Sequence, residues 1–200
     1  MSEGILFVVT GPSGAGKTTI IKEILELYKE DLEFSVSYTT RNKRAGETSG
    51  SDYYYIDDSK FQEMVEKDAF LEFADVHGYK YGTSREYIES RTKTGKNVLL
   101  DIDVQGALNV KSNKADAVTV FVAPPSYSNL VSRLTGRGTE NNTDLLKRLE
   151  DAKKELRLIK EFDYVIVNED VDHSISLMKS IINSEKIRVF RMSDFLKQFM

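Results

Sequence analysis

The stretch that decides the fold is Gly11-Pro12-Ser13-Gly14-Ala15-Gly16-Lys17-Thr18, near the start of this 200-residue chain. It follows the pattern G-x-x-x-x-G-K-[ST]. An apolar, β-branched run at residues 5–10 precedes it and predicts a buried strand. On the far side of the loop, apolar residues recur at helical spacing, namely Ile20, Ile21, Ile24, Leu25 and Tyr28. Strand, glycine loop and helix in this order indicate a phosphate-binding loop (P-loop) rather than a chance glycine-rich turn.

The residues of this loop have distinct tasks in binding a triphosphate. Glycines allow the backbone to curl so that successive N–H groups point at phosphate oxygens, and the helix N-terminus adds a favourable dipole. Lys17 would place a positive charge against the β and γ phosphates, and the Thr18 hydroxyl would complete the shell of a Mg²⁺ ion. We therefore predict that residues 11–18 bind a nucleoside triphosphate together with Mg²⁺.

Further strands of the same type are predicted at residues 98–102, 118–122 and 164–167, and a helical pattern follows each of them. Strands that alternate with helices predict an α/β fold, here a three-layer α/β/α core with a parallel sheet. Residues 172–199 are expected to continue as one amphipathic helix. Its apolar face, which would pack against the sheet, contains Ile175, Met178, Ile181 and Ile182.

The region between residues 34 and 84 departs from this alternation. Short aromatic strands around residues 53–56, 70–73 and 79–81, separated by glycines, predict an inserted mixed-β lobe. One helix inside it is expected to begin at Ser59, with Gln62 completing a capping box. We predict a single domain with three parts. These are a core (1–33, 85–125 and 151–200), the lobe (34–84) and a helical lid (126–150) whose residues 136–143 form a surface loop.

Composition excludes several classes of protein. The chain has no cysteine, which rules out disulfides and thiolate sites, and its two histidines, His77 and His173, cannot form a metal cluster alone. A metal must therefore be held by oxygen ligands. A net charge of −4 argues against general electrostatic binding of nucleic acid, which needs a basic surface. Because no apolar run is long enough to span a bilayer and no basic leader precedes the first apolar run, we expect a cytoplasmic protein without membrane contact.

A GTPase is the alternative that two short motifs suggest. Residues 103–106 have the form D-x-x-G and residues 113–116 have the form N-K-x-D, as in GTPases. In GTPases these motifs follow different strands, whereas here six residues separate them and the second precedes a strand. We interpret residues 113–116 as an ordinary polar turn.

Residues 34–53, Phe-Ser-Val-Ser-Tyr-Thr-Thr-Arg-Asn-Lys-Arg-Ala-Gly-Glu-Thr-Ser-Gly-Ser-Asp-Tyr, resemble the GMP-binding signature of guanylate kinases. The resemblance continues through residues 70–74, 81–83, 100–106, 124–126, 136–139 and 165–168, and these segments occur in the same order as in guanylate kinases. Together with the P-loop, these segments cover nearly the whole chain. The resemblance implies transfer of the γ-phosphoryl group of ATP to GMP, giving ADP and GDP, in purine nucleotide metabolism and GMP recycling.

The resemblance also implies a GMP site. Arg41 and Arg44 match arginines that bind the GMP phosphate, as suits bidentate guanidinium groups, and Tyr53 and Tyr81 match the phenols beside it. Glu72 matches the carboxylate that recognises guanine, since guanine offers adjacent N1–H and 2-amino donors where adenine presents an acceptor. Other matching residues complete the base site, namely Ser37, Thr83 and Asp103.

On the ATP side, Asp101 matches a carboxylate near the metal and is our candidate for the outer shell of Mg²⁺. It is also counted with the GMP-binding residues, because the roles of Asp101 and Asp103 could be exchanged. Arg133, Arg137 and Arg148 match lid arginines that close on ATP, and Asn168 matches a residue near the adenine. Four of the matched side chains are expected to be catalytic: Lys17, Arg41, Arg137 and Arg148.

The chemistry needs no general base, because the acceptor phosphate has a second pKa of about 6 and is largely deprotonated at neutral pH. Positioning and charge stabilisation would dominate instead.

Two other functions remain open, which are a kinase for another nucleoside monophosphate and a guanylate-kinase-like module that binds peptides in scaffold proteins. Such modules typically have a damaged P-loop, whereas this loop is intact. Whether the protein is a monomer or a homo-oligomer is undecided.

Overall fold

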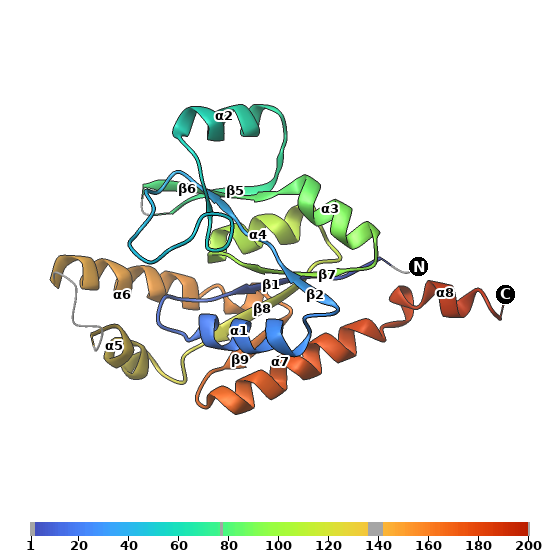
Figure 1. Ribbon diagram of the computed structural model, residues 1–200. Helices are drawn as coiled ribbons and strands as arrows, with labels where there is room; N and C mark the ends of the chain where they lie inside the picture. Colours follow the sequence, from blue (N-terminus) through green and yellow to red (C-terminus); the bar gives the residue numbers. More distant parts are fainter. Residues whose placement is uncertain (1–2, 77, 136–141, 200) are drawn as a thin grey trace.

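The computed structural model describes residues 3–76, 78–135 and 142–199, and within them it contains two β-sheets (Figure 1). The larger sheet has the strand order β2-β7-β1-β8-β9, and every neighbouring pair is parallel. Its strands are β1 (Leu6–Thr10), β2 (Leu32–Phe34), β7 (Asn97–Asp101), β8 (Val118–Ala123) and β9 (Tyr164–Val167). The predicted parallel sheet is thus confirmed, with β2 as a strand that the sequence pattern did not predict.

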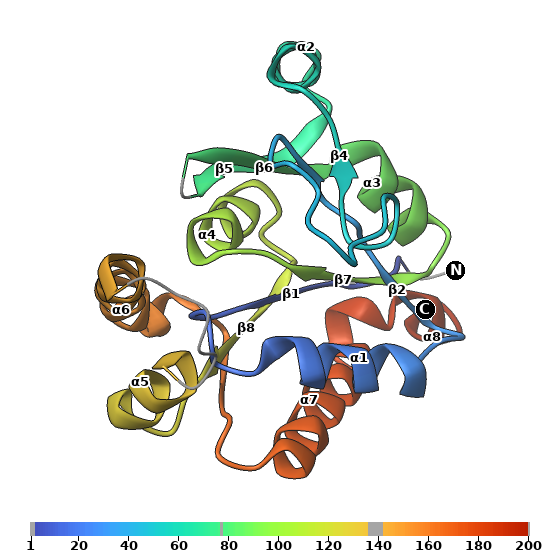
Figure 2. The same cartoon turned by 60° about the vertical axis from the view of Figure 1, so that its left-hand side comes forward.

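Helices cover both faces of this sheet (Figure 2). Successive strand residues point to opposite faces, so Phe7 and Val9 of β1 join one apolar cluster while Leu6 and Val8 join another. The first cluster includes side chains from α1 and α7, and the second includes side chains from α3 and α4. The helices are α1 (Lys17–Leu27), α3 (Arg85–Lys93), α4 (Val104–Asn113) and α7 (Val171–Lys186). The three-layer α/β/α core is therefore confirmed.

The second sheet lies over the face that α3 and α4 cover, as both ribbon views show. Its strand order is β4-β3-β6-β5, with β3 and β4 parallel and the other pairs antiparallel, so it is the mixed sheet that the sequence predicts. Leu71 of this sheet joins the apolar cluster of α3 and α4, which fixes the sheet to the core. The elements are β3 (Tyr38–Thr39), β4 (Tyr54–Tyr55), α2 (Asp58–Glu66), β5 (Phe70–Val76) and β6 (Tyr79–Ser84).

Two more helices, α5 (Tyr127–Thr135) and α6 (Asn142–Leu156), pack against each other through Leu130, Leu134 and Ala152. Of the surface loop predicted at residues 136–143, residues 136–141 lie outside the described part of the chain. The short turns η1 (Ile159–Glu161) and η2 (Val189–Arg191) and the helix α8 (Ser193–Leu196) complete the elements. None of the helices in the described ranges combines the length and hydropathy needed to cross a membrane.

Two sequence predictions about helix ends are wrong. Helix α2 is capped by Asp57 rather than Ser59, because the Asp57 carboxylate accepts a hydrogen bond from the backbone N–H of Lys60. The helix expected over residues 172–199 ends at Lys186. The Arg191 guanidinium donates to the backbone oxygen of Asp116, and this bond ties the segment after α7 to the residues just before β8.

Candidate functional site

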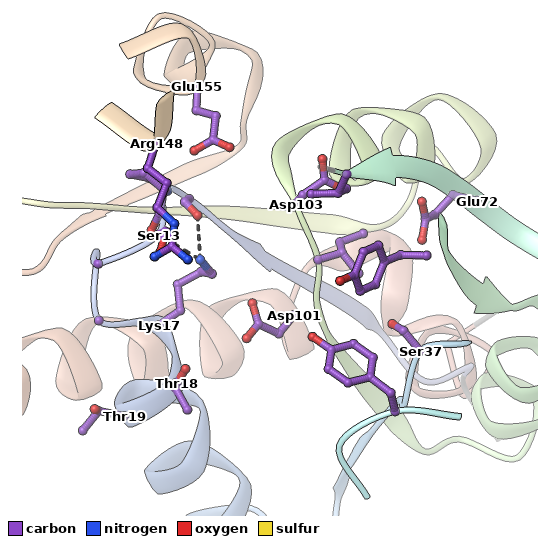
Figure 3. A pocket seen from close by; sticks show the side chains of 18 residues that line it. Ser13, Lys17, Thr18, Thr19, Ser37, Glu72, Asp101, Asp103, Arg148 and Glu155 are labelled. Atoms are coloured by element: carbon purple, nitrogen blue, oxygen red, sulfur yellow. Dashed lines mark hydrogen bonds between the residues drawn. The ribbon is translucent and has the colours of Figure 1, made fainter. Parts of the chain in front are cut away.

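A cavity of about 430 Å³ lies at the edge of the main sheet where the parallel strands end (Figure 3). The carboxyl edge of a parallel sheet is the usual place for a ligand in an α/β fold. Segments from the P-loop, both sheets and α6 line the cavity. Its lining residues are Gly11, Pro12, Ser13, Gly14, Gly16, Lys17, Thr18, Thr19, Ser37, Tyr53, Glu72, Val76, Tyr81, Asp101, Ile102, Asp103, Arg148 and Glu155.

The P-loop connects β1 to α1 in a conformation that requires glycine. Gly11, Gly14 and Gly16 all have positive φ angles, and a Cβ atom on Gly11 would lie 2.1 Å from the backbone oxygen of Val122. No side chain in the described part of the chain caps the N-terminus of α1, so its first N–H groups remain available to an anion. The Lys17 ammonium is folded back on the loop and donates to the Gly11 backbone oxygen at 2.6 Å. This arrangement matches a loop that is ready to receive phosphate.

Asn168 and Arg133 do not line the cavity. Both instead donate hydrogen bonds to the backbone of the P-loop. The buried Asn168 amide donates to the backbone oxygen of Ala15 at 2.7 Å, and Ser174 donates to its carbonyl. Arg133 donates to the backbone oxygens of Asn168 and, at 3.4 Å, of Ala15. In this geometry Asn168, Arg133 and the fully buried Ala15 position the loop for the residues that face the ligand.

Asp101 is the last residue of β7, Asp103 follows two residues later, and both line the cavity. Asp103 is the N-cap of α4, and its carboxylate accepts hydrogen bonds from the backbone N–H groups of Gln105 and Gly106. Burial raises the pKa of both carboxyl groups, while the nearby Lys17 ammonium opposes the rise. Asp103 therefore has a structural task in addition to the predicted ligand contact.

At the end of the cavity away from the P-loop, Glu72 of β5 lies beside Ser37, as Figure 3 shows. The buried Glu72 carboxylate accepts a hydrogen bond from the Thr83 hydroxyl at 2.6 Å, so Thr83 supports Glu72 from outside the cavity lining. Burial raises the pKa of Glu72 to about 7, and the Asp103 charge adds to the rise. Gly106 makes room for it, since a Cβ atom there would lie 2.8 Å from Oε2 of Glu72.

Arg41 lies beside this end of the cavity without lining it. Its guanidinium forms an ion pair of 2.7 Å with Glu47 and lies 5.3 Å from the centre of the Tyr53 ring, which does line the cavity. The hydrogen bond that Arg41 donates to Glu47 raises the pKa of Arg41 and lowers that of Glu47 to about 2. The exposed Arg44 donates its backbone N–H to Glu47 at 2.8 Å. Glu47, which we did not predict as a site residue, therefore organises both arginines.

The α6 helix contributes two charged side chains to the cavity. Arg148 was predicted, whereas Glu155 was not, although its spacing of seven residues from Arg148 places both on one face of a helix. Burial raises the pKa of Glu155 to about 7. Arg137, predicted to act in catalysis and to bind ATP, lies outside the described residues. Other lining residues that we did not predict are Thr19, Val76 and Ile102.

A three-layer fold with a glycine loop between the first strand and helix, and a lysine and threonine at the start of that helix, defines the P-loop class of α/β proteins. The family model for guanylate kinase matches residues 4–185. The chain therefore belongs to the guanylate kinase family.

Individual relatives agree with this assignment. The guanylate kinase of Thermotoga maritima is 50% identical over 197 residues, which cover 98% of this chain and 95% of that protein. The guanylate kinase of Caldanaerobacter subterraneus is 43% identical, with 96% and 93% covered. The crystal structure of guanylate kinase from Anaplasma phagocytophilum has a TM-score of 0.80 at 31% identity and covers 96% of this chain and 90% of that one.

Proposed function

We propose that this protein transfers the γ-phosphoryl group of ATP to GMP, giving ADP and GDP. The observation that carries the proposal is a single cavity with a P-loop at one end and a buried glutamate at the other. The first end suits a triphosphate, and the second suits the adjacent N1–H and 2-amino donors of guanine. A nucleotide at each end would direct its phosphates towards the centre, where Lys17 and Asp101 lie.

The residues around Lys17 fit a Mg²⁺ ion. Thr18 and Asp101 both line the cavity there, and oxygen donors are the ligands that Mg²⁺ prefers. The Asp101 carboxylate accepts no hydrogen bond from any residue that the structure describes, so it keeps its capacity to accept one from a water on the ion. We propose Thr18 as a ligand and Asp101 as an outer-shell group. When bound, the ion would neutralise charge on the β and γ phosphates.

The protein's own contribution would be to bind, orient and exclude water. Arg41 and Arg44 would bind the GMP phosphate, and Glu47 links the two residues through its ion pair with the Arg41 guanidinium and its hydrogen bond from the Arg44 backbone N–H. Lys17, Arg137 and Arg148 would stabilise the transferred group. Because water could also accept this group, we propose that the lid (126–150) and the lobe (34–84) close before transfer. We also propose that the reaction serves purine nucleotide metabolism in the cytoplasm.

The test is the formation of ADP from ATP with GMP, AMP, UMP and dTMP in turn, each with and without Mg²⁺. We expect rapid turnover with GMP and Mg²⁺ and little with the other acceptors. Equal use of AMP and GMP would contradict the role of Glu72. If no acceptor gave turnover, the guanylate-kinase-like binding module would be the better description.

A further inference from the structure

The charges that line the cavity present a problem for a site that binds two polyanions. Among the described lining residues, the cations are Lys17 and Arg148, whereas four side chains carry carboxyl groups: Glu72, Asp101, Asp103 and Glu155. Three of the four have a task, since in the proposed reaction Glu72 would face guanine and Asp101 would face the metal, and Asp103 caps α4. The fourth, Glu155, has none in the proposed reaction.

Glu155 is held in the cavity by its position in α6. It is the second-last residue of the helix, and the following Leu156 packs in the cluster of Val104 and Phe121, so this end of α6 is fixed to the core. Figure 3 shows the carboxyl group directed from α6 into the pocket, on the side where Lys17 and Arg148 lie. A carboxyl group here faces the place where the P-loop would bind phosphates.

The charged groups around Glu155 do not hold its carboxyl group in the ionised form. The Lys17 ammonium of α1 favours its ionised form, but Asp103 at the start of α4 and Asp151 on α6 oppose it, and burial opposes it most strongly. Within the described ranges, no donor forms a hydrogen bond or ion pair with the Glu155 carboxyl group. A triphosphate in the P-loop would add several negative charges beside it and favour the neutral acid further.

We propose that Glu155 is a further ATP-binding residue, which acts as a neutral carboxylic acid and donates a hydrogen bond to a phosphate oxygen of the triphosphate. The proton is taken up from solvent as the triphosphate binds, and it stays on Glu155 throughout phosphoryl transfer. A partly buried acid that is kept neutral in order to donate has the same chemistry as a protonated aspartate in an oxyanion hole. This inference rests on the proposed ATP site.

Three variants of the full chain test whether Glu155 acts as a neutral hydrogen-bond donor or as an anion. In Glu155→Gln the amide can still donate a hydrogen bond but has no proton that titrates. In Glu155→Met the side chain has a similar size but cannot donate a hydrogen bond. Glu150→Gln is the matched control, because Glu150 lies on α6 with a side chain that is 72% exposed. The probe is the non-hydrolysable analogue adenosine 5′-(β,γ-imido)triphosphate, measured calorimetrically without metal in buffers of different ionisation enthalpy.

We expect the wild type and Glu150→Gln to take up about half a proton more per bound analogue at pH 7 than Glu155→Gln does, given a pKa of about 7. If only neutral Glu155 is competent, the ratio of the wild-type Kd to that of Glu155→Gln should rise roughly tenfold between pH 6 and pH 8. Glu155→Met should bind more weakly than Glu155→Gln at every pH.

Equal proton uptake by the wild type and Glu155→Gln would overturn the proposal. So would a Glu155→Gln variant that binds as weakly as Glu155→Met, because Glu155 would then act as an anion. Failure of the wild type to bind the analogue at all would instead contradict the ATP site itself, and with it the proposed function.

Discussion

Replacement of Glu72 by glutamine tests guanine recognition separately from ATP binding. The wild-type carboxylate is buried, accepts a hydrogen bond from Thr83 at 2.6 Å and has its second oxygen next to Gly106. Glutamine has nearly the same shape but only one acceptor oxygen. In the variant, an amide N–H₂ group would face the N1–H and 2-amino donors of the base, while the P-loop at the far end of the cavity would be unchanged.

The expected size of the effect follows from the two hydrogen bonds at stake. A hydrogen bond to a charged group contributes about 1.5–3 kcal/mol, so the loss of two amounts to roughly 3–6 kcal/mol. Since about 1.4 kcal/mol corresponds to a factor of ten, kcat/KM for GMP should fall roughly 10²- to 10⁴-fold. The already low rate with AMP should change far less, because adenine does not use this acceptor.

The pH dependence gives an independent measure of the same residue. Burial raises the pKa of Glu72 to about 7, and only the ionised form offers both oxygens to guanine. In the wild type, kcat/KM for GMP should therefore fall by up to about tenfold per pH unit below pH 7, and Glu72→Gln should lack this component. A raised pKa also means that ionisation destabilises the fold as pH rises from 4.5 to about 7, so the variant should melt no lower than the wild type at pH 8.

The assay is ADP formation coupled to NADH oxidation, with GMP and AMP as acceptors across this pH range. Asp75→Asn is the matched control, since it removes a charge from an exposed position of the same strand. A Glu72→Gln variant whose kcat/KM for GMP stays within about threefold of wild type would refute the reasoning, because that factor is less than one hydrogen bond is worth.

Three further predictions concern the supports of the site. Asn168→Ala leaves the Ala15 backbone oxygen without its amide donor and should lower the free energy of unfolding by about 1–3 kcal/mol in urea titrations; an unchanged midpoint would contradict the bracing role. Glu47→Gln should lower the melting temperature at neutral pH. Because the pKa of Glu47 is lowered to about 2, that difference should vanish as pH falls from 4.5 to about 2. Glu185→Ala removes a carboxylate that is 1% exposed and ion-paired to Arg191 at 3.6 Å, and should cost about 3–5 kcal/mol in the same urea titrations, whereas a loss below about 1 kcal/mol would argue against the pair.

Local sequence patterns predicted the main sheet because its strands are apolar and end in chemically distinctive residues. The apolar run before Gly11 and the carboxylates of Asp101 and Asp103 at the end of β7 are examples, since the parallel order brings the ends of both strands to one edge of the sheet. Strand β2, in contrast, has only three residues, too few to show a period, and its place is set by pairing with β7. The end of α7 was missed because Arg191 is held by a contact with Asp116, distant in sequence.

Some features of the candidate site could likewise be predicted from local sequence, and others could not. The P-loop and Glu72 could be predicted because motif and chemistry agree within short segments. That Asn168 and Arg133 would support the P-loop from behind could not be predicted, since this depends on how β9 and α5 pack against residues far away in the chain. Glu155 could have been found by helical spacing from Arg148, but the spacing alone does not show that this face of α6 is turned to the cavity.

Gly106 places stability and function in conflict at one position of α4. Inside a helix, alanine is favoured over glycine by about 1 kcal/mol, so selection for stability alone would replace it. The added methyl group would lie 2.8 Å from Oε2 of Glu72 and 3.0 Å from Oδ1 of Asp103, so both carboxylates would have to shift. A single substitution at residue 106 therefore sets the preference of the helix for alanine against guanine recognition, while the P-loop at the far end of the cavity is unchanged.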